Sequence, residues 1–137
     1  MSVRNWQTFS LSDFDLQFQY PHTTPTGHAV EMDDVRVHFR SPDTPELYFE
    51  VSRHLRVSAE AFYDREKGFV AAQLQDAEVG ALTPTTLAGQ PAHTFSFRWK
   101  DGERAVILME KQHYLYRFIY DPRSRLNLDV LATIKLA

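Results

Sequence analysis

Six histidines are the residues of this chain most suited to metal chemistry. His22 and His28 share one segment, and His38 and His54 fall near the ends of two predicted strands. Neither spacing matches a zinc-ligand signature, and no two histidines stand four residues apart, as a helical pair of ligands requires. Cysteine is absent, which excludes disulfides, thiolate catalysis and Cys-ligated metals. We therefore predict histidines on the surface or in strands, with no metal site and no cofactor.

Acidic residues offer two further kinds of chemistry. Glu31, Asp33 and Asp34 carry the oxygen ligands that a hard cation such as Ca²⁺ prefers, but the spacing of an EF-hand loop is missing. Glu46 and Glu50 are a carboxylate pair, although sequence spacing alone does not establish a glycosidase site. The chain also lacks Gly-x-Ser-x-Gly, Ser-x-x-Lys and a phosphate-binding glycine loop. These observations favour a protein that is not an enzyme.

Arg117 stands within an otherwise apolar strand. A buried arginine needs a partner, and Glu110 on the same predicted face is the candidate. The pair is either structural or part of a clamp for a carboxylate or phosphate, which the planar guanidinium binds well. Glu66 lies between Phe62 and Phe69 at helical spacing. It is either a buried acid, a residue that extends to the edge of the apolar stripe, or the partner of an arginine.

Trp99 and Arg104 stand on either side of Asp101-Gly102, a dipeptide typical of a two-residue type I′ hairpin turn. With that loop, Trp99 lies directly opposite Arg104. We therefore expect a cross-strand cation–π contact between them. Because tryptophan and arginine dominate binding hot spots, this hairpin tip is also a candidate contact surface.

Three consecutive strands must position these residues, and we predict them at His93–Trp99, Glu103–Lys111 and Tyr114–Tyr120. Side-chain alternation divides them into two faces. One face carries Phe95, Phe97, Trp99, Val106, Leu108, Leu115 and Ile119, and the other carries Ala105, Ile107, Met109, Tyr114, Tyr116, Phe118 and Tyr120. A sheet with one wet face would show polar residues on alternate positions, and these strands do not. We expect a cover on each face, most simply by helices, which is an α/β/α sandwich.

The remaining segments complete a single domain over residues 1–137, because no repeat and no linker divides the chain. The predicted elements are a hairpin over Thr8–Tyr20 that turns at Ser12-Asp13, strands at Val35–Arg40 and Leu47–Arg53, a helix over Ala59–Gln75 capped by Ser58, an extended Val79–Leu87, and a C-terminal helix with Pro122 in its first position. The fold class is therefore α+β, with a mainly antiparallel sheet.

Composition limits the partners. The net charge of −3 gives no electrostatic reason to expect nucleic acid, which calls for a basic surface. No apolar run is long enough to span a membrane, and the first residues lack the apolar core of a signal peptide. We expect a cytoplasmic protein, unless an export signal has been removed.

Three short stretches give a resemblance. They are Phe18-Gln19-Tyr20-Pro21, Leu87-Ala88-Gly89-Gln90-Pro91-Ala92 and Leu131-Ala132-Thr133-Ile134-Lys135-Leu136. In order and spacing they resemble the PsbP-like superfamily, which includes photosystem II PsbP-type proteins, the fungal Ran-binding import factor and uncharacterised bacterial proteins. Gly89 with Ala92, and Thr133 with Ile134, match its short motifs. The resemblance implies an α/β/α sandwich and a scaffold or assembly role, although likeness of this kind transfers fold better than function.

Two functions follow from these observations. The first is a non-enzymatic binding or assembly module that acts through protein–protein contacts, which are compatible with a homodimer. Its expected contact residues are Trp99, Lys100, Arg104, His22 and His28, the last two in the loop between Pro21 and His28. The second is a small-ligand-binding protein or enzyme with a pocket between the sheet and the helix at residues 59–75. The expected ligand-binding residues of that alternative are Arg117, Glu110, Tyr114 and Tyr116.

Overall fold

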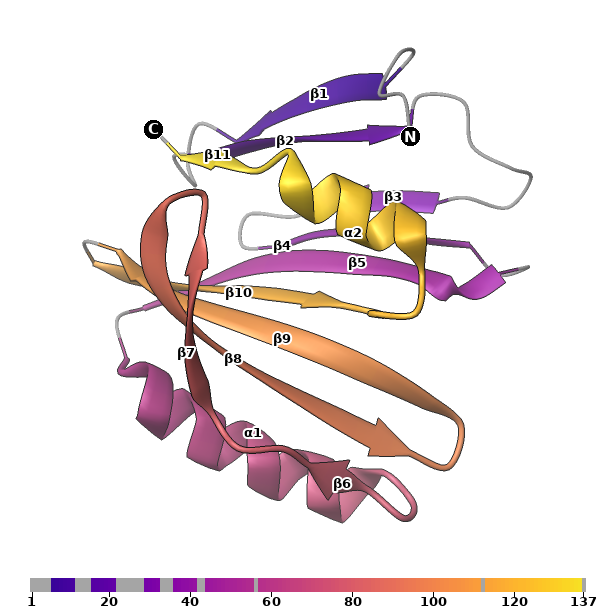
Figure 1. Cartoon of the computed structure of the whole chain (residues 1–137), viewed down its shortest axis with the longest axis vertical. Coiled ribbons are helices and arrows are strands. Elements are labelled where there is room, and N and C mark those ends of the chain that lie inside the picture. Colours follow the sequence, from indigo (N-terminus) through magenta and orange to yellow (C-terminus); the bar gives the residue numbers. More distant parts are fainter. Residues whose placement is uncertain are drawn as a thin grey trace.

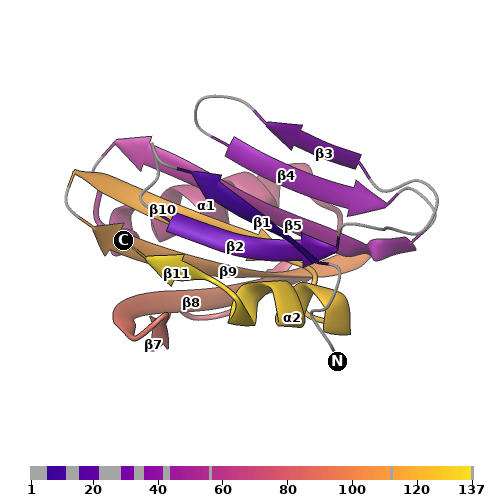
Figure 2. The ribbon, with the colours of Figure 1, turned by 90° about the horizontal axis from the view of Figure 1, so that it is seen from above.

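The computed structural model of the chain describes residues 6–11, 16–21, 29–32, 36–41, 44–55, 57–111 and 113–136. The elements in chain order are β1 (Trp6–Leu11), β2 (Leu16–Pro21), β3 (Ala29–Met32), β4 (Arg36–Ser41), β5 (Thr44–Leu55), α1 (Ala59–Gln73), β6 (Glu78–Val79), β7 (Thr83–Leu87), β8 (Gln90–Trp99), β9 (Gly102–Lys111), β10 (Tyr114–Tyr120), α2 (Arg125–Ala132) and β11 (Lys135–Leu136). One antiparallel sheet has the order β3-β4-β5-β10-β9-β8-β6, with β7 also paired to β8, and β1-β2-β11 form a smaller sheet. Helix α1 and the small sheet lie at opposite ends of the molecule in Figure 1, and in the view from above the small sheet lies in front of α1 (Figure 2). The predicted class, α+β with a mainly antiparallel sheet, is confirmed.

The β8–β9–β10 meander keeps its predicted strands, but the first turn differs. Trp99 pairs with Gly102, so the two turn residues are Lys100 and Asp101 rather than Asp101 and Gly102. A Cβ atom at position 102 would lie 3.0 Å from the Trp99 ring, so glycine leaves room for the indole beside it. The register therefore moves by two residues, which changes the cross-strand partners and keeps every side chain on its predicted face.

A turn with positive φ occurs one hairpin earlier, between β7 and β8. Ala88 and Gly89 have φ values of 51° and 78°, and Leu87 pairs with Gln90 across them. Positive φ at both central residues is the geometry of a type I′ turn. Glycine accepts it freely, whereas Ala88 adopts it against the ordinary preference of a residue with a Cβ atom. The second turn of the meander matches its predicted register, with Met109 opposite Tyr116.

Two hydrophobic clusters lie on the two faces of the meander. The first contains Phe95, Phe97, Val106, Leu108, Leu115 and Ile119 with Ala59 and Val70 of α1. The second contains Ala105, Ile107, Met109, Tyr116, Phe118 and Tyr120 with Phe49 and Val51 of β5 and Val130 and Ile134 from the C-terminal segment. Both sets match the predicted faces, and both are buried. Trp99 packs against the first cluster, and Tyr114 packs against the second. Both side chains are partly buried.

The predicted helix starts and the shortest strands had different outcomes. Ser58 caps α1 as predicted, with its hydroxyl accepting a hydrogen bond from the Ala61 amide at 3.1 Å. Helix α2 begins at Arg125 with Ser124 as its N-cap, so Pro122 lies in the preceding turn and not in the first helical position. Strands β3 and β11 were not predicted, because four and two residues are too short for alternation to identify them. The predicted turn at Ser12-Asp13 lies outside the described residues.

Candidate functional site

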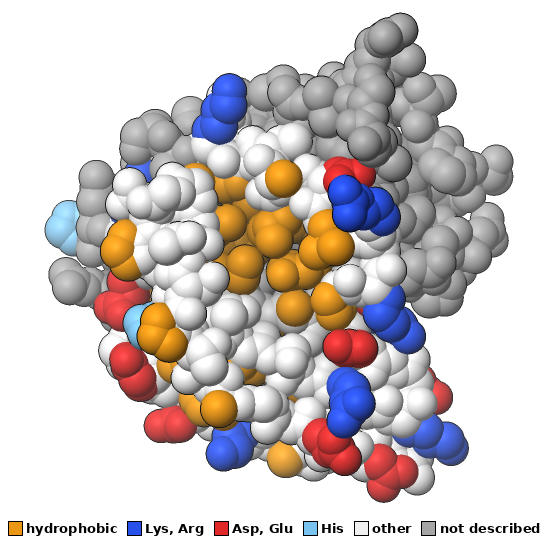
Figure 3. Space-filling model, in the orientation of Figure 1, with side chains coloured by type: hydrophobic (Ala, Val, Ile, Leu, Met, Phe, Trp, Pro, Cys, Tyr) orange, Lys and Arg blue, Asp and Glu red, His pale blue; other side chains and the backbone are white. Residues whose placement is uncertain are grey.

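The β8–β9 hairpin ends in a surface that we call the tip surface, made of Asp76, Glu78, Arg98, Trp99, Lys100, Asp101 and Glu103. Two shallow, open hollows adjoin there. One has a volume of about 370 Å³ and includes Glu78, Arg98 and Glu103 in its lining. The other has a volume of about 270 Å³ and is lined by Asp76, Glu78, Arg98, Trp99 and Lys100. Figure 3 shows acidic and basic side chains alternating at the lower right, where Figure 1 places the end of this hairpin.

Backbone hydrogen bonds hold the tip surface in place. The Lys100 amide donates to the Gln75 carbonyl at 3.0 Å, which ties the hairpin turn to the segment after α1. The Gly80 amide donates to the Ser96 carbonyl at 2.8 Å, which extends the pairing of β6 with β8. The Tyr63 hydroxyl of α1 donates to the Gly80 carbonyl at 2.7 Å. A surface fixed in this way loses little conformational freedom when it binds a partner.

Trp99 is half-buried at this surface. Its ring centroid lies 5.7 Å from that of Phe97, so its inner side is part of the apolar core beneath α1. The guanidinium carbon of Arg104 lies 5.3 Å from the Trp99 ring centroid, which confirms the predicted cation–π contact. The contact is diagonal, because Arg104 pairs in register with Phe97.

Arg104 itself turns inward, which corrects its expected place on the contact surface. Its Nη1 atom lies 3.3 Å from the Asp121 carboxylate, and its guanidinium carbon lies 4.3 Å from the Tyr48 ring centroid. Only 16% of the Arg104 side chain is exposed. Burial lowers the pKa of this arginine, while the Asp121 carboxylate acts in the opposite direction. The guanidinium therefore serves the interior rather than a partner.

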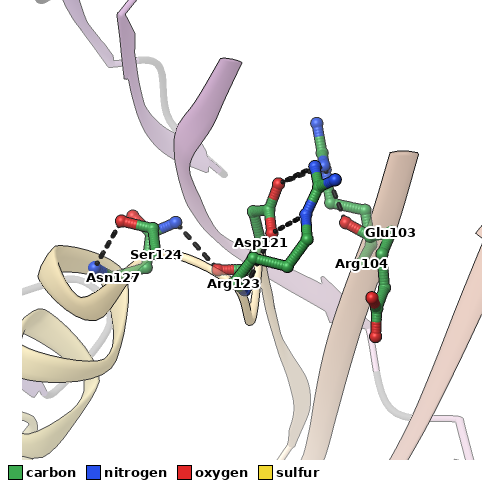
Figure 4. Close-up of polar contacts among 6 residues, drawn as sticks. All are labelled: Glu103, Arg104, Asp121, Arg123, Ser124 and Asn127. Atoms are coloured by element: carbon green, nitrogen blue, oxygen red, sulfur yellow. Dashed lines mark hydrogen bonds and ion pairs between the residues drawn. The ribbon is translucent and has the colours of Figure 1, made fainter. Parts of the chain in front are cut away.

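Asp121, whose side chain is fully buried, is the centre of a polar network (Figure 4). Its carboxylate accepts hydrogen bonds from the Arg123 amide at 2.9 Å and from the Arg123 guanidinium at 2.6 and 3.0 Å. The Asn127 side-chain amide donates to the Asp121 carbonyl at 3.0 Å. Burial alone would raise the pKa of Asp121, but the hydrogen bonds and charges of Arg123 and Arg104 hold it below its ordinary value. The network joins the end of β10 to α2, so its role is to hold these two elements together.

Arg117 pairs with Glu66 of α1, so the partner expected from the sequence, Glu110, is wrong. The guanidinium makes a two-pronged contact with the Glu66 carboxylate, and a Glu50 oxygen lies 4.0 Å away. Glu110 instead accepts a hydrogen bond from the Ala59 amide at 3.3 Å. The partner was missed because α1 brings Glu66 over the sheet from 51 residues away along the chain. Its position in the apolar stripe of the helix was the available signal.

Strand β5 adds a polar row that the sequence analysis did not identify. The Tyr48 hydroxyl donates to Glu50 at 2.9 Å, and burial together with the Glu50 charge raises the pKa of Tyr48 to about 12. Ser52 and His54 are in hydrogen-bond contact at 2.9 Å. Burial lowers the pKa of His54, and the positive charge of Arg117 adds to this effect. Alternation of polar residues with the buried Phe49 and Val51 was the signal for this row.

The four residues of the alternative pocket do not converge. Arg117 and Glu110 face α1, as their contacts with Glu66 and Ala59 show. Tyr116 belongs to the opposite cluster, and Tyr114 packs against that cluster with its ring centroid 4.1 Å from the Arg53 guanidinium carbon. One pocket beneath α1 therefore cannot be lined by all four residues.

Other predicted chemistry is tested only in part. Within the described residues, no group of three or more histidine, aspartate and glutamate side chains could hold a metal ion. His22, His28, Asp33 and Asp34 lie outside that part of the chain. No helix in the described part is long and apolar enough to cross a membrane.

Comparison with known proteins concerns the fold. No family model matches the sequence, and no curated protein matches it. The solution structure of cyanobacterial PsbP from Synechocystis sp. PCC 6803 is similar over 99% of this chain and 95% of its own, with a TM-score of 0.70 and 16% sequence identity. A crystal structure from Bacteroides thetaiotaomicron is similar over 97% of this chain and 49% of its own, with a TM-score of 0.55 and 11% identity. The resemblance expected from the short motifs is therefore confirmed at the level of architecture, and this chain has the PsbP-like fold.

Proposed function

We propose that the protein is a non-enzymatic binding or assembly module that contacts a protein partner through the tip surface. The observation that carries the proposal is the half-buried Trp99, which is set in a rigid hairpin and surrounded by exposed charged residues. An aromatic anchor with a polar rim is the usual composition of a binding hot spot. The proposal also includes the finer expectations of a helix on each face of the sheet, a cytoplasmic location and a protein partner.

The alternative function has less support. A ligand clamp needs a guanidinium fork that is free to receive a carboxylate or phosphate. The Arg117 fork is occupied by Glu66, and Glu50 is near it as well.

Site-specific photo-crosslinking in the native organism tests the proposal. A benzophenone side chain replaces Lys100 in one variant and Asp64 in the other. Both positions are exposed, but Asp64 lies on α1 and lines neither hollow of the tip surface. We expect a defined adduct with one protein from position 100 and none from position 64. Equal adducts from both positions, or none from either, would refute the assignment of the site.

A second test measures how much of the protein partner each variant of the tip surface binds. Lys100→Ala removes an exposed side chain and is expected to weaken capture without moving the thermal melt. Trp99→Ala is expected to weaken capture more, but it also removes packing against Phe97, so its melt is measured beside the capture. Arg104 is left intact, because its contact with the buried Asp121 would confuse folding with binding.

A further inference from the structure

The tip surface carries more acidic than basic side chains. Four carboxylates, those of Asp76, Glu78, Asp101 and Glu103, stand against two cations, Arg98 and Lys100, which leaves a net charge of −2. All six residues are exposed except Glu103, which is half-buried. Arg104, whose charge the sequence alone would add here, turns inward to Asp121.

Arg98 is already compensated. It lies directly opposite Glu78 on β6 and directly opposite Glu103 on β9, so the three residues form a row across neighbouring strands. Its guanidinium is 2.7 Å from the Glu78 carboxylate. The Glu78 hydrogen bond raises the pKa of Arg98, and the charges of Glu78 and Glu103 add to this effect. Lys100, beside Asp101, is therefore the cation of the tip surface that an incoming anion could approach, whereas an incoming cation would find a carboxylate at each end of the row.

The smaller hollow brings a further feature to the same place. Trp99 and Asp76 are both part of its lining, and the two hollows share Glu78 and Arg98. A planar guanidinium can stack on an indole ring while it pairs with a carboxylate, which a compact ammonium group does less well. The hollow is open, so a side chain can enter it from an extended segment that lies across the hairpin.

We infer that the tip surface binds an arginine-bearing peptide segment of a protein partner. This inference rests on the proposed function and names the chemistry of its partner. The net charge of the surface favours a cation, and the presence of Trp99 and Asp76 in the lining of one hollow favours arginine over lysine.

Peptide binding to the whole chain tests the inference. Three matched synthetic peptides of glycine and serine carry three arginines, three lysines or three glutamates. Trp99 is the reporter in a Trp6→Phe background, since the chain has two tryptophans. We expect the arginine peptide to change Trp99 fluorescence and to bind about tenfold more tightly than the lysine peptide, with affinity falling as salt rises. No change with the arginine peptide, or equal binding of the glutamate peptide, would overturn the inference.

A pair of variants with the same loss of charge separates a site from general attraction. Asp76→Asn with Glu103→Gln removes two carboxylates at the tip surface, and Glu60→Gln with Asp64→Asn removes two from α1. We expect the first pair to weaken the arginine peptide about tenfold and the second to change it less than about twofold. Equal effects would show that only net charge matters, which overturns the inference. Sedimentation of the free chain gives a further check. A concentration-dependent dimer that Asp76→Asn with Glu103→Gln abolishes would also overturn the inference.

The crosslinking variants distinguish the two proposals. A native adduct from position 100 that survives Asp76→Asn with Glu103→Gln, while the arginine peptide is lost, overturns the arginine-bearing partner and leaves the binding module standing. Absence of any adduct from position 100 removes the proposed function itself.

Discussion

Arg117 and Glu66 show how a charged pair is kept inside a mainly apolar layer. Their side chains are only 16% and 10% exposed, and the two-pronged contact satisfies the guanidinium where water is scarce. Removal of one partner from such a pair destabilises the folded protein, mainly because it leaves an uncompensated buried charge.

We expect Glu66→Ala to lower the free energy of unfolding by about 2–3 kcal/mol, because Arg117 would keep only the more distant Glu50. Glu66→Ala with Arg117→Met should recover most of that loss, since no buried charge then remains. Urea melts of the two single variants and the double variant measure the coupling. Additive losses would mean that the pair contributes nothing beyond two independent side chains.

His54 should make stability depend on pH. Its pKa in the folded protein lies below 6.5, because burial and the Arg117 charge disfavour the imidazolium. The unfolded chain then binds more protons than the folded chain as pH falls below about 6.5, so stability decreases in that window and is regained above it. Urea melts at neutral and mildly acidic pH should show this loss, and His54→Gln should reduce it. An unchanged dependence in the variant would assign the titration to other groups.

At the scale of elements, the meander was predictable because its information is local. Alternation along β9 and β10 assigns each side chain to a face, and a register shift of two residues leaves those assignments intact. The turn itself was not predictable from Asp101-Gly102, because the indole of Trp99 packs against Gly102 and moves the turn back by one residue. Packing decided what dipeptide preference could not.

The candidate site divides along the same line. The position of Trp99 and Lys100 at the hairpin tip could be predicted, because residue type and hairpin position are local properties. Arg104 was misplaced because its partner Asp121 comes from the end of another strand, and Asp76 was missed because it reaches the tip surface only through the turn after α1. Contacts between segments far apart in the sequence carry no short-range signal.

The two faces of the meander can each be tested by one phenylalanine. Phe97 is 5% exposed beneath α1, and Phe118 is fully buried on the opposite face. Each change to alanine should lower the free energy of unfolding by about 3–5 kcal/mol, since a cavity remains where the ring was. Phe69→Ala is the control, because that ring is 66% exposed and its loss should cost less than about 0.5 kcal/mol. A loss under about 1 kcal/mol for either core variant would mean that its face is not a packed core.

On the scale of the whole molecule, the C-terminal segment connects the two sheets. It leaves the large sheet at the Asp121 network, buries Val130 and Ile134 in the second cluster, and ends as β11 paired with β2 of the small sheet. The C-terminal segment therefore packs on the large sheet and also pairs with the small sheet. The β8–β9 turn lies near the point where this segment leaves the large sheet, because Tyr120 pairs with Ala105 and Arg104 contacts Asp121.

A fold held together in this way should not need a metal ion. We expect thermal melts of the full chain with and without a strong chelator to superimpose, because a chelator removes stability only where metal binding contributes to folding. Cysteine is absent, and among the described residues no three histidine, aspartate or glutamate side chains are placed to hold a metal ion. A drop of many degrees on chelation would contradict this expectation. Its reversal by Zn²⁺ would implicate His22 and His28, and its reversal by Ca²⁺ would implicate Asp33 and Asp34, since imidazole suits zinc and carboxylates suit calcium.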